Sequence, residues 1–125
     1  MSSELYISII IPFYNAKQHI KNCLDSLTVQ DFKKPFEVIM VDDGSNDDSQ
    51  KVIKEYNYKD LKLYSLSKNS GPGAARNIGL KKAKGEYIFL LDVDDKIASN
   101  TLTLLYEVAS QTNCDYVFSD FSRIE

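Results

Sequence analysis

The chain has 125 residues, of which 43% are hydrophobic and 26% charged, a composition typical of one globular domain with its own core. Its formal net charge of −3 excludes the extended basic surface with which proteins bind nucleic acid. No stretch has the length of a membrane-spanning helix, and the first residues lack the basic and apolar regions of a signal peptide. Cys23 and Cys114 lack metal-ligand spacing, so we expect both to be buried, reduced thiols of a cytoplasmic protein.

Short apolar runs predict strands, and they alternate with segments in which apolar residues recur at helical spacing. The predicted strands cover residues 5–11, 36–41, 61–66, 86–91 and 116–119. This alternation predicts an α/β fold with a Rossmann-like parallel sheet and helices on both of its faces. We expect a single domain over residues 1–125.

Helices are predicted between these strands, and their starts carry capping residues. The first has Asn15 as its N-cap and an apolar stripe over residues 20–27. The second takes its cap from Ser45 or Asn46, with the acidic residues 47–48 in its first turn. The last covers about residues 100–110.

Polar loops follow three of the predicted strands, at residues 12–15, 42–45 and 92–95. In open α/β sheets, ligands bind beyond the carboxyl ends of the strands. We therefore expect the three loops to meet at one edge of the sheet and to form a site there.

The acidic loop contains Asp92, Asp94 and Asp95, directly after a strand predicted to be buried. Like charges this close repel one another, and a bound cation relieves the repulsion. Oxygen ligands suit Mg²⁺ or Mn²⁺, whose remaining positions are usually filled by water and substrate phosphate. The motif predicts a metal-dependent enzyme with a phosphate-bearing substrate; a solvated acidic turn is the alternative.

The loops after the first two strands offer groups that can bind a nucleotide. Asp43, with Asp42 beside it, can accept a hydrogen bond from a base imide or a ribose hydroxyl, and Tyr14 can stack on a base. The alternatives are a turn made by Gly44 and a surface tyrosine. Asn15 is assigned to capping.

A glycine-rich turn at residues 70–73 precedes a helix that ends at Gly85 and carries Arg76 in its first turns. The turn lacks the Gly-Lys-Ser/Thr ending of a phosphate-binding loop, and Arg76 stands where a dinucleotide fingerprint needs glycine. Arg76 suits bidentate contacts with phosphate, or an ion pair with the aspartates. His19, the only histidine, is expected on a helix surface without a role, and no nucleophile triad is indicated.

Taken together, these motifs resemble the amino-terminal part of a family 2 glycosyltransferase with the GT-A fold. The matching stretches occur in the family's order, at residues 8–15, 41–45, 71–79, 85–88 and 91–95. The resemblance implies a nucleotide-diphosphate sugar donor, often UDP-linked, and a sugar or lipid-linked acceptor. It also implies a place in bacterial polysaccharide synthesis, in the cytoplasm or at the inner face of the membrane.

The resemblance also implies roles for individual residues. The expected substrate-binding residues are Pro12, Tyr14, Asp42, Asp43, Arg76, Asp92 and Asp94. Residues 92–95 match the DxD motif, in which Asp95 is the expected direct ligand of Mg²⁺ or Mn²⁺ and Asp94 contacts the sugar or ribose and assists with the metal.

One departure from the family's pattern concerns catalysis. Family members place a carboxylate base and an acceptor-binding half well downstream of the DxD motif, and Asp115 and Asp120 come too soon to match that base. We therefore expect no catalytic residue in this chain, a domain that stops before the acceptor half, and doubtful transfer by the chain alone.

Two other classes of function stay open. A non-catalytic module could use the sheet for assembly with a partner or with a second copy. A phosphoacceptor domain or aspartate-based phosphatase has acidic strand ends and could use Lys96, but it gives no role to residues 12–15 or to the glycine-rich turn.

Overall fold

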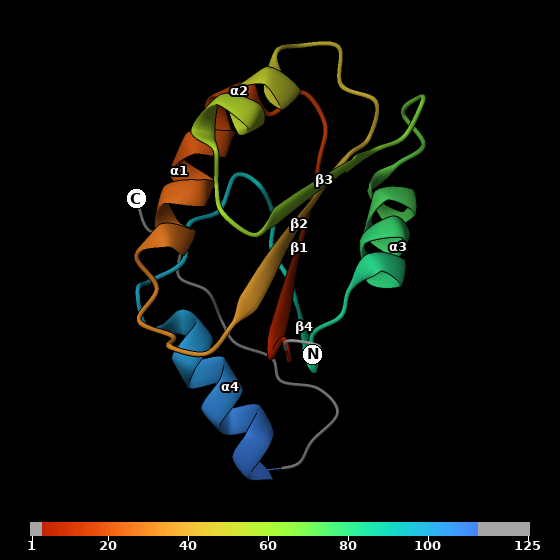
Figure 1. Cartoon of the computed structure of the whole chain (residues 1–125). Coiled ribbons are helices and arrows are strands. Elements are labelled where there is room, and N and C mark those ends of the chain that lie inside the picture. Colours follow the sequence, from red (N-terminus) through yellow and green to blue (C-terminus); the bar gives the residue numbers. More distant parts are fainter. Residues whose placement is uncertain (1–3, 113–125) are drawn as a thin grey trace.

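The computed structural model describes residues 4–112, which form four strands and four helices in alternation (Figure 1). In chain order they are β1 (Ile7–Phe13), α1 (Lys17–Thr28), β2 (Phe36–Asp42), α2 (Ser49–Tyr56), β3 (Leu61–Ser65), α3 (Pro72–Lys82), β4 (Tyr87–Leu90) and α4 (Thr101–Thr112). The strand predicted at residues 116–119, Cys114, Asp115 and Asp120 lie outside the described residues. Within these residues, no helix combines the length and apolarity needed to cross a membrane.

The four strands form one sheet in the order β3-β2-β1-β4, and every neighbouring pair is parallel. Strand β1 is central and pairs along its whole length with β2, from Ile7 opposite Phe36 to Phe13 opposite Asp42. All carboxyl ends therefore point to the same edge, which confirms the predicted parallel α/β arrangement.

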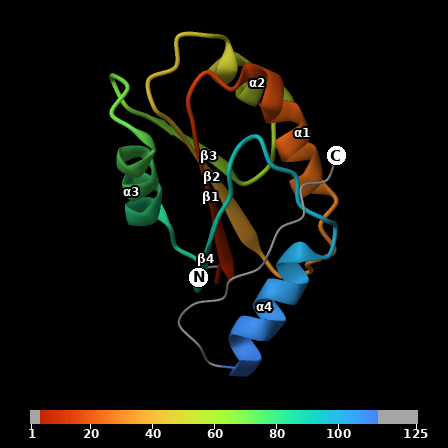
Figure 2. The same ribbon diagram turned by 180° about the vertical axis from the view of Figure 1, so that it is seen from behind.

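Helices cover both faces of this sheet, as predicted (Figures 1 and 2). The larger core lies under α1, α2 and α4, where alternate residues of β1 such as Ile9 and Ile11 are fully buried. Helix α3 covers the other face, over Ile39 and Val41 of β2. A Cβ atom added to Gly79 of α3 would lie 2.5 Å from the Ile10 side chain, so this glycine lets the helix pack closely on β1.

Helix α1 is not capped by Asn15, which corrects the prediction. The N-cap residue is Ala16, and its backbone N–H donates to Ser49 Oγ at 3.1 Å. The Asn15 side chain instead accepts a hydrogen bond from the backbone N–H of Asn46. The start of α1 is thus held by the first residue of α2, a contact that local sequence does not reveal.

Helix α2 begins later than predicted, at Ser49, so the expected caps at Ser45 and Asn46 are wrong. The Asp47 carboxylate accepts the Ser49 N–H at 2.9 Å, and Asp48 occupies the N-cap position. Both acidic residues precede the helix rather than lying in its first turn. Residues 47 and 48 therefore belong to the loop between β2 and α2 and do not extend the helix.

Strand β4 is only half-buried, whereas the sequence predicted a buried strand. Ile88 is 42% and Leu90 48% exposed. They pair with Ser8 and Ile10, on the face that carries α3, but that helix packs over β1 and β2. Among the described strands β4 has a neighbour on one side only, and α3 does not reach far enough to cover it.

A buried polar network holds the amino-terminal end of the sheet. Glu37 is 2% exposed; its carboxylate accepts hydrogen bonds from Ser8 Oγ at 2.6 Å, the Lys84 N–H at 2.7 Å and Lys62 Nζ at 3.0 Å. Ser8 Oγ in turn accepts the Gly85 N–H at 2.7 Å. Burial by itself raises the pKa of Glu37, but these hydrogen bonds outweigh it and hold the pKa below its ordinary value.

Candidate functional site

A cavity of about 500 Å³ opens at the carboxyl ends of the strands. Its walls come from the loop after β1, the start of α1, the end of β2, the start of α3 and the acidic loop after β4. Six of the predicted site residues line it, namely Pro12, Tyr14, Asp43, Arg76, Asp92 and Asp94. Side chains far apart in sequence thus share one hollow because parallel strands end at the same edge.

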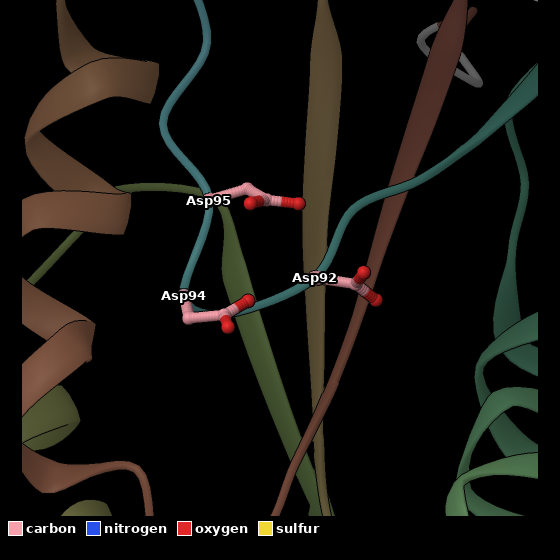
Figure 3. Close-up of side chains that lie close together, drawn as sticks. All are labelled: Asp92, Asp94 and Asp95. Atoms are coloured by element: carbon pink, nitrogen blue, oxygen red, sulfur yellow. The ribbon is translucent and has the colours of Figure 1, made fainter. Parts of the chain in front are cut away.

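The carboxylates of the acidic loop, Asp92, Asp94 and Asp95, lie close together (Figure 3). One carboxylate oxygen from each of Asp92, Asp94 and Asp95 lies within 4.8 Å of the others. The loop is a tight turn, closed by the hydrogen bond from the Asp95 N–H to the Asp92 carbonyl at 3.0 Å. Hard oxygen donors this close, with Asp92 and Asp94 exposed, fit a divalent cation that keeps open positions for water and phosphate.

The acidic loop lies close to α1, as the surroundings of Cys23 show. Burial raises the pKa of the Cys23 thiol to about 12, and the negative charges of Asp95 and Asp94 contribute to the rise. Cys23 is a free, buried cysteine, which confirms the prediction for this residue. Among the described residues, Cys23 lies outside the group of side chains close enough to share one ion.

Asp43 is already engaged by the glycine-rich turn. Its side chain is buried, and its two oxygens accept the backbone N–H groups of Ser70 at 2.7 Å and Gly71 at 2.9 Å. A carboxylate has about four acceptor positions, so Asp43 can fix this turn and still face the cavity. It therefore links the end of β2 to the start of α3.

Asp42 does not line the cavity. It is 1% exposed, and its oxygens accept the Ser45 N–H at 2.7 Å and Gln50 Nε2 at 2.6 Å. These contacts tie the end of β2 to the following loop and to α2, so the structure places Asp42 beneath the site as a support.

A reciprocal clamp joins the loop after β1 to the loop after β2. The Asn15 N–H donates to Ser45 Oγ at 2.8 Å, and the Asn46 N–H donates to Asn15 Oδ1 at 2.9 Å. Asn15 adopts a left-handed backbone conformation with φ of 48°, which asparagine tolerates better than most residues. The clamp fixes the neighbouring Tyr14, whose side chain is 44% exposed where it lines the cavity.

Replacing Gly44 by Ala is expected to destabilise the protein by about 2–4 kcal/mol. Gly44 has φ of 79°, and an added Cβ atom would lie 2.6 Å from the Asn69 backbone nitrogen and 2.7 Å from the Lys68 carbonyl carbon. The matched control is Gly73→Ala, because nothing lies within 4 Å of a Cβ atom there. Urea denaturation measures both; equal stability of the two variants would contradict the close approach of these loops.

Arg76 lies half-buried in the first turns of α3 and lines the cavity. Within residues 4–112 its guanidinium forms no ion pair, so the predicted alternative of a structural pair with the aspartates is not observed there. An arginine that lines a cavity and forms no ion pair among the described residues can bind a ligand phosphate.

His19 also lines the cavity, which the sequence analysis missed when it placed this residue on a helix surface without a role. The residue is half-buried one turn into α1 and lies four residues before Cys23. That spacing places both on the same side of the helix, and it is the signal that could have indicated an inward position.

Comparison with known proteins decides the family. The model of glycosyl transferase family 2 matches residues 8–125. The chain belongs to glycosyl transferase family 2. This confirms the predicted resemblance and the GT-A fold of the α/β sheet.

Relatives of this family 2 chain are much longer than the chain itself. The poly(ribitol-phosphate) beta-glucosyltransferase of Bacillus spizizenii is 42% identical over 122 residues, which cover 94% of this chain and 19% of the relative. The chain thus spans about a fifth of the length of that relative.

Solved structures show the same fold. Residues 1–349 of Staphylococcus aureus TarS, in complex with UDP-GlcNAc, match with a TM-score of 0.81 and 38% identity over 87% of this chain and 32% of that one. The Pyrobaculum calidifontis mannosyltransferase PcManGT, in complex with GDP-Man and Mn²⁺, matches with a TM-score of 0.72 and 28% identity. That match covers 81% of this chain and 31% of the mannosyltransferase.

Proposed function

We propose that this chain binds a UDP-linked sugar together with Mg²⁺ or Mn²⁺ and forms the donor site of an inverting glycosyltransferase. One observation carries the proposal: Arg76, which forms no ion pair within residues 4–112, lines the same cavity as Asp92 and Asp94, and these two carboxylates cluster with that of Asp95. The donors bound to the two solved relatives, UDP-GlcNAc and GDP-Man, support a nucleotide-diphosphate sugar.

The base and ribose are assigned to the part of the cavity formed by the loops after β1 and β2. Tyr14 supplies a partly exposed ring on which a base can stack, and Pro12 forms the adjoining wall. Asp43 keeps acceptor capacity for a base imide or a ribose hydroxyl. Asp42 acts from beneath by fixing the loop, in place of the direct contact that the sequence suggested.

The diphosphate is assigned to Arg76 and the acidic loop. Arg76 can donate two hydrogen bonds to phosphate oxygens. Asp94 and Asp95 are the residues that would hold the cation, and Asp92 completes the cluster and contacts the donor. When bound, a divalent cation neutralises the diphosphate and stabilises the charge on this leaving group.

In transfer, the acceptor hydroxyl would attack the anomeric carbon as the bond to the nucleotide diphosphate breaks, with inversion. Residues of this chain orient the donor and stabilise the departing diphosphate. None of the described residues is assigned the base that removes the acceptor proton. We place the base, and the residues that bind a sugar or lipid-linked acceptor, outside residues 4–112. We assign the reaction to polysaccharide synthesis at the inner face of the membrane.

A melting-temperature assay tests the proposal. UDP with Mn²⁺ is expected to raise the melting temperature by about 10 °C at a hundredfold excess over Kd, since a ligand stabilises the state to which it binds. UDP without a divalent ion should give a much smaller rise, and ADP with Mn²⁺ controls for base recognition. No rise with UDP, GDP or ADP at millimolar ligand and metal would refute the proposed donor site.

A further inference from the structure

His19 is a polar side chain of the cavity to which the proposed function gives no role. It lies on α1, is half-buried and contributes to the cavity wall. Within residues 4–112, neither of its ring nitrogens takes part in a side-chain hydrogen bond or an ion pair. An imidazole in a ligand-sized cavity therefore has a free donor and a free acceptor to offer.

The position of His19 along the cavity follows from its neighbours on α1. His19 and Cys23 are four residues apart and share one side of the helix. Cys23 belongs to the core cluster against which Val93 of the acidic loop packs, so this side of α1 faces that loop. Val93 and Asp94 line the cavity together with His19. His19 thus borders the end of the cavity assigned to the diphosphate and sugar.

Arg76 and His19 belong to helices on opposite faces of the sheet. Helix α3, with Arg76, covers one face and α1, with His19, covers the other (Figures 1 and 2). Both side chains border the same cavity, so a ligand at the sheet edge would meet Arg76 from one side and His19 from the other. His19 is also outside the group of side chains close enough to share one ion, which argues against a role as a metal ligand.

We propose that His19 donates a hydrogen bond to an oxygen on the sugar-diphosphate half of the donor, and not to the nucleoside. The inference rests on the proposed function, because it assumes that a nucleotide-diphosphate sugar occupies this cavity. Either a phosphate oxygen or a sugar hydroxyl can accept this hydrogen bond. Ligands that add the diphosphate and then the sugar to the nucleoside distinguish the two acceptors.

The test compares the binding of uridine, UDP, UDP-glucose and UDP-GlcNAc in the presence of Mn²⁺ by calorimetry. His19→Phe keeps a ring of similar size and removes the donor, and His19→Gln restores an N–H donor. Gln18→Ala is the matched control, because Gln18 is the exposed neighbour on α1 and does not line the cavity. Melting temperatures without ligand establish that every variant is folded.

The expected result is that His19→Phe weakens the binding of both UDP-sugars about five- to tenfold, leaves uridine binding unchanged, and is partly rescued in His19→Gln. An equal loss for UDP identifies a phosphate oxygen as the acceptor, and unchanged UDP binding identifies a sugar hydroxyl. An equal loss for uridine, or no loss for any ligand, would overturn the inference. Failure of the unsubstituted protein to bind UDP would instead refute the proposed function itself.

Discussion

Replacing Asp95 by Asn is expected to abolish the Mn²⁺-dependent part of the rise in melting temperature that UDP produces, about 10 °C at a hundredfold excess over Kd. The substitution keeps the size of the side chain but removes one of three carboxylates whose oxygens lie within 4.8 Å of one another. A neutral amide oxygen is a weaker ligand for a hard cation. The variant should therefore respond to UDP in the same way with and without Mn²⁺.

The matched control is Glu107→Gln, which removes one negative charge from the exposed side of α4, away from the acidic loop. It should retain the full Mn²⁺-dependent rise. Titration of Mn²⁺ alone, followed by electron paramagnetic resonance, measures metal binding without any donor and should show at least about a tenfold loss for Asp95→Asn only. A metal-dependent rise that survives the Asp95 substitution would remove Asp95 from the metal site.

Replacing Glu37 by Gln should cost about 3 kcal/mol of unfolding free energy, because it breaks a buried, hydrogen-bonded charge. The Glu37 carboxylate accepts hydrogen bonds from Ser8, Lys84 and Lys62. In the amide, an NH₂ group that can only donate replaces one oxygen, and it would face either the Lys62 ammonium or the donors on the other side. Urea denaturation measures the loss.

The double variant with Lys62→Met provides the control, since it removes the ammonium that an NH₂ group would face. The double variant should lose less unfolding free energy than the sum of the losses of the two single variants, as expected for residues in contact. The pKa of Glu37 lies below its ordinary value in the folded state. Its contribution is therefore complete above the unfolded-state pKa and is lost as the pH falls through the folded-state pKa.

It follows that the difference in stability between the unsubstituted protein and Glu37→Gln should shrink as the pH is lowered from 7 into the acidic range. A difference that stays constant down to the lowest pH at which the protein folds would show that the Glu37 charge contributes nothing.

Much of the fold could be predicted because local pattern and topology agree. All but one residue of each of the strands β1 and β2 is buried, and the alternation of strands with helices leaves a parallel sheet as the favoured arrangement. The exposure of β4 could not be predicted, because Ile88 and Leu90 are as apolar as the residues of β1. Ile88 and Leu90 are exposed because β4 lies at the side of the sheet that α3 does not cover. This position depends on how the helix packs on the sheet.

Some features of the candidate site could also be predicted from the sequence, and others could not. The meeting of Tyr14, Arg76 and Asp92 at one cavity follows from strand direction alone, so the sequence could predict it. The contacts of Asp43 with the glycine-rich turn depend on how two loops pack, and so does the inward position of His19. The Asp43 contacts leave no periodic signal in the sequence, and for His19 the only signal is its four-residue spacing from Cys23.

The Glu37 network and the cavity lie at opposite ends of the same strands. Glu37 and Ser8 are near the start of β2 and β1, whereas Asp43 and Tyr14 follow their ends. Substitutions in the loops around the cavity therefore need not disturb the hydrogen bonds that hold the start of the sheet. If the cavity binds the proposed donor, its sugar specificity can change without compensating mutations in the core.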